Sequence, residues 1–344
     1  MNVKKLTGGD LSELRSFFNN KNIGKYNVYS SVSKEKSPIL LFNDFKKYYE
    51  NNKEIYFISE NYKILGLAGF RKLGWDSEIF GFNCSCLDYF YIEDRYYQRR
   101  AFDSLVGIID NWIKENEIKF MVTKINGENK NIVDLLIDYK FENIEKLKTL
   151  RNNLSDLSKY ENIENSGNYA KFCPEFSNGQ FQKICGPINR IVHKIRAFKE
   201  EDIETIGKIS AESFLYTRFM KDKRFGSDKA SALNYKWAVN CCRGRSDEVL
   251  VSDVENKVAG FITCNIESIE NMQYGDIQLL AVDKDFRGRG LAKDLVSAAK
   301  NWFKENNCKF VDVSTQSDNL PALDIYKKSN FVDAYSQITL HKWI

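Results

Sequence analysis

The sequence is poor in the residues on which several enzyme classes depend. Among its 344 residues are 2 histidines, 4 prolines and 8 cysteines, and no two cysteines form a C-x-x-C pair. Two histidines offer little for Ser-His-Asp, Cys-His or H-E-x-x-H chemistry, and the cysteine spacing argues against a zinc ribbon. So few prolines argue against a disordered or collagen-like chain. We expect a globular protein without a bound metal.

Long apolar runs and an excess of one charge are missing as well. No stretch approaches the roughly 18 apolar residues of a membrane span, and the first residues lack the apolar core of a signal peptide. With 51 Lys+Arg against 47 Asp+Glu, the formal charge of +4 does not favour a nucleic-acid partner. We expect a cytoplasmic protein that binds neither membranes nor nucleic acid. At roughly 150 residues per domain, the length predicts about two domains.

An internal repeat organises the chain. Residues 111–120 and 301–310 are identical at seven of ten positions. Extended without a gap at the same offset, 190 in the numbering, the alignment reaches twelve identities over forty positions. Residues that each occur at about 5–7% would give about two or three by chance. The sequence therefore predicts a duplicated domain.

Both copies show the same order of expected elements. A strand and an amphipathic helix open each copy, and a strand, a long amphipathic helix, a second strand, a short helix and a final strand pair follow. This order predicts two α/β domains, each with a mixed sheet. We expect the first domain at residues 1–150, a linker packed on the domains at 151–187, and the second domain at 188–344.

A glycine-containing loop in the second copy suits a phosphate. It follows a strand that ends in Leu280, Ala281 and Val282. The loop and the start of the long helix consist of Arg287, Gly288, Arg289, Gly290, Leu291 and Ala292. Unpaired N–H groups and the positive end of a helix dipole bind phosphate oxygens, glycine lets a ligand approach, and arginine adds charge. The alternative is a turn that merely uses glycine.

This loop resembles motif A of the GNAT acetyltransferase superfamily, R/Q-x-x-G-x-G/A after a bulged strand. Downstream, a second signature of the superfamily, N-x-x-A-x-x-x-Y-x-x-x-G-F, is resembled by Asn319, Ala322, Leu323, Tyr326, Ser329 and Phe331. Asn330 stands where the superfamily usually has glycine, at a turn that needs a positive φ, which asparagine tolerates. The resemblance implies tandem GNAT-like domains, the second of them catalytic.

The resemblance also implies a reaction. An amine attacks the thioester of acetyl-CoA directly, and a backbone N–H at the end of the bulged strand polarises the thioester carbonyl. The pantetheine chain pairs with residues 280–282 and contacts Asn319, while the amides of residues 288–292 hold the pyrophosphate. Tyr326 protonates or hydrogen-bonds the departing thiolate. By residue type alone, Tyr326 would be a core tyrosine.

A narrower resemblance, to the dTDP-fucosamine N-acetyltransferase group, concerns the acceptor. The segments that carry it are Thr217-Arg218-Phe219, Trp237 with Arg243-Gly244, Thr315-Gln316, and residues 73–81. It implies a nucleotide-linked amino sugar. Residues 217–225 contain four cations, Arg218 among them, and two phenylalanines, including Phe219. Cations fit a diphosphate and aromatic rings fit a base or sugar, although a solvated surface loop has the same composition.

Several alternatives stay open. The acceptor could instead be an amine of a peptide, an antibiotic or a polyamine, and a CoA-sensing or scaffold module would need no acceptor. No general base is singled out, because Glu267, Asp276 and Gln278 all lie near the right strands and a water relay or an already neutral amine would also serve.

The first copy lacks the features expected to bind acetyl-CoA. At the offset of 190, Gln98 and Arg100 stand opposite Gly288 and Gly290, and Leu136 stands opposite Tyr326. We therefore expect one acetyl-CoA per chain. The first copy would shape the acceptor cleft or form a homodimer interface.

Overall fold

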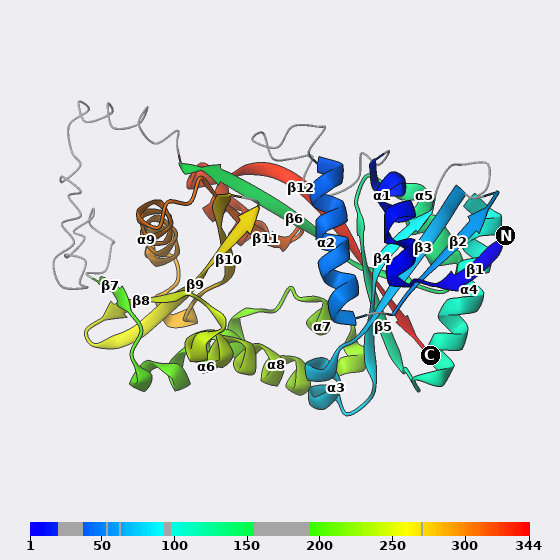
Figure 1. Cartoon of the computed structure of the whole chain (residues 1–344). Coiled ribbons are helices and arrows are strands. Elements are labelled where there is room, and N and C mark those ends of the chain that lie inside the picture. Colours follow the sequence, from blue (N-terminus) through cyan, green and yellow to red (C-terminus); the bar gives the residue numbers. More distant parts are fainter. Residues whose placement is uncertain (20–36, 53, 62, 93–97, 155–192, 270) are drawn as a thin grey trace. The chain divides into compact units, whose positions relative to one another are not determined.

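The computed structural model describes the chain except for residues 20–36, 53, 62, 93–97, 155–192 and 270. Most of the expected linker, residues 151–187, and its aromatic side chains therefore lie outside the described residues. The chain forms two compact units (Figure 1). None of the helices in the described part is long and apolar enough to cross a bilayer.

The first unit comprises Met1–Leu147 and Tyr335–Ile344. Its strands are ordered β1-β2-β3-β4-β5-β12, with β4 and β5 parallel and the other recorded pairs antiparallel. The elements are β1 (Asn2–Lys5), α1 (Leu11–Asn19), α2 (Ser37–Asn52), β2 (Ile55–Glu60), β3 (Lys63–Lys72), α3 (Gly74–Phe80), β4 (Cys84–Ile92), α4 (Gln98–Glu115), β5 (Phe120–Asn126), α5 (Lys130–Asp138) and most of β12 (Val332–Trp343).

The second unit comprises Lys148–Ala334, with strands ordered β6-β11-β10-β9-β8-β7. Only β10 and β11 are recorded as a parallel pair among its described strands. The elements are the end of β6 (Glu142–Asn153), β7 (Lys194–Ala197), α6 (Ile203–Ser213), α7 (Arg218–Lys221), α8 (Ser227–Asn240), β8 (Glu248–Val254), β9 (Lys257–Ile269), β10 (Met272–Val282), α9 (Leu291–Glu305), β11 (Phe310–Gln316) and α10 (Leu320–Lys328).

Helices cover both faces of the second sheet. Apolar residues of α9 recur at the spacing of one helix face, as in Leu295, Ala299 and Phe303, and pack against alternate residues of β8 to β11. Helices α6 and α8 pack on the intervening residues of β8 to β10. In Figure 1 they accordingly lie on the opposite side of these strands from α9. This two-layer covering confirms the predicted mixed α/β fold.

The repeat reappears in the structure at the predicted offset. The bounds of β5 and β11, of α5 and α10, and of β6 and β12 each differ by this offset at both ends. Helices α4 and α9 also end at equivalent positions, Glu115 and Glu305, but α4 begins earlier relative to the repeat. The difference lies at the glycine loop.

The last strands of the two copies are exchanged. Gln337–Trp343 of β12 pairs with Phe120–Asn126 of β5 in the first unit, whereas the end of β6 lies beside β11 in the second. The units therefore differ from the expected divisions at 1–150 and 188–344. Because β6 and β12 descend from the same strand of the repeat, the hydrophobic pattern alone does not select which unit each one completes.

Candidate active site

Strand β10 carries an irregularity before the glycine loop. Its pairing with β9 passes from Ile277 opposite Cys264 to Leu280 opposite Ile262, which places one extra residue in β10. The Leu279 N–H donates to the Thr263 side-chain hydroxyl at 3.0 Å. Pairing with β11 is recorded only from Gly275 to Ile277. Residues 280–282 thus pair with β9 along one edge, and their other edge is suited to an extended ligand.

The glycine loop is open at the start of α9. Gly288 and Gly290 have φ angles of 75° and 89°, a conformation that side-chain-bearing residues adopt at a cost. A Cβ added to Gly288 would meet no atom within 4 Å. The first hydrogen bond of the helix runs from the Asp294 N–H to the Gly290 carbonyl, at 3.2 Å. The N–H groups before Asp294 thus lie at the start of α9, the kind of helix end that suits an anion.

The two loop arginines have different surroundings. Arg287 Nε donates to the Val282 carbonyl at 2.9 Å, and its Nη2 donates to Ser213 Oγ at 3.1 Å. Arg287 therefore ties the loop to the end of β10 and to α6. The guanidinium of Arg289 lies 5.6 Å from the ring centre of Phe286. Of the two, Arg289 is better placed to meet a phosphate.

Asn319 has a structural role at the start of α10. Its Oδ1 accepts from the Ala322 N–H at 3.4 Å, and its Nδ2 donates to Thr315 Oγ1 at 3.1 Å. These bonds cap the helix and hold it to β11. The cofactor contact expected of Asn319 stays a prediction. Asn330 has a φ of 65°, the left-handed conformation that the sequence predicted.

Tyr326 is a residue of α10 whose side chain lies in the core of the second unit. Its side chain is 4% exposed and packs against Phe331, with ring centres 5.7 Å apart. Burial raises the pKa of Tyr326, so the phenol stays protonated at neutral pH, the form that can donate a proton. No hydrogen bond to its hydroxyl is recorded within the described chain. Its role towards a thiolate stays a prediction.

The expected acceptor loop is held by its own side chains. Phe219 and Phe225 are buried, with ring centres 5.1 Å apart, so stacking on a ligand is not their main contact. The Arg218 guanidinium lies 4.0 Å from the ring centre of Phe219. Arg224 donates twice to Asp222, at 2.7 and 3.0 Å. The packed rings thus support Arg218 at the start of α7.

Contacts across the second unit bring this loop to the glycine loop. At one end, Lys284 Nζ lies 3.4 Å from Glu212 Oε2, next to the bond between Arg287 and Ser213. At the other end, Lys221 Nζ lies 2.8 Å from Asp318 Oδ2, beside the start of α10. Segments that lie far apart in the sequence are therefore neighbours. Residues 214–221 thus connect the neighbourhood of the glycine loop to the start of α10.

Asp276 is the carboxyl best suited to accept a proton. It precedes the irregularity in β10 and pairs in register with Asn265 of β9 and Asp312 of β11. Burial, with smaller contributions from the negative charges of Asp312 and Glu267, raises its pKa to about 7, while a hydrogen bond from Gln278 opposes the rise. A carboxyl that titrates near neutral pH is typical of a general base.

Sequence reasoning missed a buried ion pair beside Asp276. Arg151 of β6 donates to Asp312 of β11 through Nε and Nη2, both at 2.7 Å. Both residues are buried. A position-by-position comparison of the copies contains a clue, because Asp312 stands opposite Val122 at the offset of 190. The partner could not be found this way, since it depends on the strand exchange.

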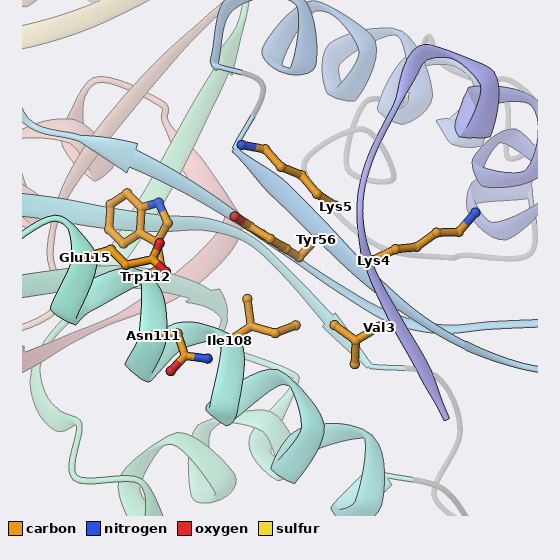
Figure 2. A pocket seen from close by; sticks show the side chains of 8 residues that line it. All are labelled: Val3, Lys4, Lys5, Tyr56, Ile108, Asn111, Trp112 and Glu115. Atoms are coloured by element: carbon orange, nitrogen blue, oxygen red, sulfur yellow. The ribbon is translucent and has the colours of Figure 1, made fainter.

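The first unit has no glycine loop at the equivalent place. Residues 98–100 form the first turn of α4 instead. A cavity of about 230 Å³ lies along the second half of this helix (Figure 2), and its lining consists of Val3, Lys4, Lys5, Tyr56, Ile108, Asn111, Trp112 and Glu115. Its two lysines are paired with Asp10 and Glu54. The cavity is therefore not equivalent to the site of the second unit.

Comparisons with known proteins agree with this geometry. Residues 213–331 match the Acetyltransferase (GNAT) family. An uncharacterized N-acetyltransferase of Methanocaldococcus jannaschii is 28% identical over 151 residues, which cover 42% of this chain and 66% of the relative. N-alpha-acetyltransferase 30 of Saccharomyces cerevisiae is 32% identical over 82 residues, 24% of this chain and 47% of the relative. The matched part of the chain thus spans less than two thirds of the length of either relative.

A solved structure extends the likeness to both units. A tandem GNAT protein from the clavulanic acid biosynthesis pathway has a TM-score of 0.56 at 8% identity, covering 99% of this chain and 98% of that chain. At this identity the likeness concerns the fold alone. GNAT domains depend on acetyl-CoA, which suits the open β10 edge and the glycine loop. Residues 213–331 are therefore similar to the GNAT acetyltransferase family, and the fold of the whole chain is similar to that of a tandem GNAT protein.

Proposed function

We propose that the second unit transfers the acetyl group of acetyl-CoA to the amine of a nucleotide-linked amino sugar. One observation carries the proposal. Along a single strand, Asp276 is followed by the irregularity, the open edge at residues 280–282 and then the glycine loop. A proton acceptor for the amine, a backbone edge for the pantetheine chain and an anion site for the diphosphate would thus follow one another along the chain.

The residues of the loop fit the diphosphate of acetyl-CoA. The φ angles of Gly288 and Gly290 turn the backbone into α9, and the open space at Gly288 allows close approach. N–H groups of residues 288–292 would bind the phosphate oxygens. The backbone of residues 280–282 would hold the pantetheine chain and polarise the thioester carbonyl.

The reaction needs one group that accepts a proton and another that donates one. Asp276 accepts a proton from the ammonium group of the acceptor, and the neutral amine then attacks the thioester carbonyl carbon. A C–N bond forms and the C–S bond breaks, so that the electron pair leaves on sulfur. The thiolate takes a proton from Tyr326, which regains one from solvent, and the amide nitrogen loses its extra proton to water.

The acceptor class rests on the loop at Arg218. This guanidinium is supported by the buried Phe219, in a loop whose ends contact the glycine loop and the start of α10. A planar guanidinium next to an apolar surface suits the diphosphate of a sugar nucleotide. The narrower family resemblance supports the same choice.

Release of thiol from acetyl-CoA tests this function. A panel of nucleotide 4-amino sugars, peptides with free N-termini and polyamines would be assayed with the full chain. We expect turnover with a nucleotide amino sugar and a loss of about 10²–10⁴ in Asp276→Asn. Glu267→Gln is the comparison variant: Glu267 is exposed on the neighbouring strand, so its loss should keep turnover at neutral pH and only lower the pKa of Asp276, which its charge helps to raise. If none of the acceptors in the panel supports thiol release, the proposal is contradicted.

A peptide N-terminal amine is the second candidate. It is favoured by the 32% identity to the relative named for N-alpha acetylation. Turnover of peptides together with inert nucleotide amino sugars would establish this candidate and reject the first. Tight acetyl-CoA binding with no turnover of either would indicate a CoA-binding module.

A further inference from the structure

Arg151 is held by two independent contacts in the second unit. Its Nε and Nη2 form a fork onto both oxygens of Asp312, and its guanidinium lies 4.2 Å from the ring centre of Phe310. Such a bidentate pair has fixed geometry. Both side chains are buried, so replacing the arginine leaves a buried carboxylate without its cation.

Asp312 lies directly beside Asp276. The two residues pair in register across parallel strands, so their side chains point to the same face of the sheet. Glu267 of β9 is the other acidic group that raises the pKa of Asp276, and Gln278 donates to its carboxyl. Burial raises the pKa of Asp312, and Arg151 opposes that rise.

The first unit has replaced all three positions together. At the offset of 190, Asp276, Asp312 and Arg151 become Cys86, Val122 and His341. The structure confirms the equivalence, since Val122 pairs in register with both Cys86 and His341. If the Arg151–Asp312 ion pair served only to determine which strands pair, Asp276 would not have to differ between the units together with it. The acidic pair and its arginine occur in the unit that carries the glycine loop.

We propose that Arg151, supplied by the first copy of the repeat, is a positioning residue of the second unit that anchors Asp312 as the charged neighbour of Asp276. The proposal rests on the function given above, in which Asp276 accepts the proton of the amine. The first copy thus contributes to catalysis through one strand, although it has lost its own loop.

Two single variants should move the pH profile in opposite directions. Asp312→Asn removes a negative charge next to Asp276, so the acid limb of kcat/KM should move to lower pH by about one unit. Arg151→Met leaves Asp312 without its cation beside Asp276, so the first proton bound by the two neighbouring carboxyl groups should be held to higher pH and the limb should move up. Arg151→Lys should stay close to the wild type.

A measurement without substrate separates this proposal from the proposed function. The chain is labelled at the aspartate carboxyl carbons, and the Asp276 resonance, assigned with Asp276→Asn, is titrated by NMR. We expect the same opposite shifts in its midpoint whether or not an acceptor has been found. His341→Met is the matched control, since His341 occupies the position of Arg151 in the first unit, and it should leave the midpoint unchanged.

The outcomes are distinct. Shifts in the NMR midpoint without any acetyl transfer would support the positioning role of Arg151 and would reject the proposed acetyl transfer. Unchanged midpoints, or shifts in the same direction in both variants, would overturn the proposal. If Arg151→Met does not fold, Asp312→Asn and the double variant Arg151→Met with Asp312→Asn decide, because neither leaves an uncompensated buried carboxylate at residue 312. Both should then titrate at lower pH than the wild type.

Discussion

The repeated elements of the two units have equivalent bounds at most positions but differ at the start of one helix. Helix α9 begins at Leu291, after two glycines with positive φ, whereas α4 begins at Gln98, which is equivalent to Gly288 in the repeat. Residues 98–100, which carry side chains, belong to α4 itself, whereas their equivalents in the second unit form the glycine turn before α9. A few backbone positions therefore account for one of the differences between the candidate site and its counterpart in the first unit.

A comparison of the cores leads to the same conclusion. Trp112 and Trp302 occupy equivalent positions on α4 and α9, and each belongs to or packs against the core cluster of its unit. Burial depends on the pattern of apolar residues and tolerates many substitutions. Phosphate binding requires particular φ angles and directed N–H groups. The repeat could keep its fold while one copy lost the chemistry.

Copying the first unit into the second should abolish cofactor binding. Gly288→Gln with Gly290→Arg introduces side chains at positions with φ of 75° and 89°, where they are strained and cover the anion site. Calorimetry should show one acetyl-CoA per chain in the unmodified protein and none in the variant, with unchanged circular dichroism. Two sites per chain, or retained binding, would show that the comparison between the units is wrong.

Tyr326→Phe should lower turnover by about 10²–10⁴ while acetyl-CoA affinity changes only a few-fold. The hydroxyl is lost but the buried ring that packs on Phe331 remains. Steady-state kinetics with the true acceptor and calorimetry with acetyl-CoA measure the two effects. Leu136→Tyr, the reverse change in the first unit, should add no turnover. Unchanged kinetics in Tyr326→Phe would make the tyrosine purely structural.

Arg218→Ala should raise the KM for a nucleotide-linked acceptor by about tenfold, the value of a charge-assisted hydrogen bond. Acetyl-CoA should be affected much less, because Arg218 starts α7 whereas the proposed anion site is at the start of α9. Separate titrations of the two substrates measure the difference. Equal losses of affinity for both substrates would point to a folding defect. If neither affinity falls, Arg218 is a surface residue without a role in acceptor binding.

The smallest effect concerns a pair of equivalent turns. Lys140 and Asn330 have φ angles of 69° and 65°, a conformation in which asparagine is less strained than lysine. Lys140→Gly should therefore stabilise the chain by up to about 1 kcal/mol, and Asn330→Gly by less. Urea unfolding of both variants measures the difference. A larger gain at residue 330 would contradict this account of the turn.

Much of the architecture could be predicted from local pattern. The offset of 190 predicted elements that the structure places at equivalent bounds, and the glycines at 288 and 290 predicted a turn with positive φ. The left-handed Asn330 was also predictable from its place in the signature. These features depend on residues close together in the sequence, so a single sequence suffices for them.

Other features depend on contacts between distant residues. Phe219 was expected to face a ligand but is buried against Phe225, since the apolar content of a loop does not reveal which side packs. Arg287 was expected to add charge for a phosphate, and the structure places it on the Val282 carbonyl. The choice of Asp276 rather than Glu267 as the proposed general base likewise required the knowledge that β11 lies beside Asp276.

The sequence by itself determined the repeat, the mixed α/β order of each copy and the loop in the second one. Only the tertiary structure decided that β6 and β12 exchange units, and that Arg151 therefore meets Asp312 rather than Val122. The physical reason is that strand pairing is satisfied by backbone hydrogen bonds that both strands offer equally. The choice between them is made by side chains that lie far apart in the sequence, and their contact exists only in the folded chain.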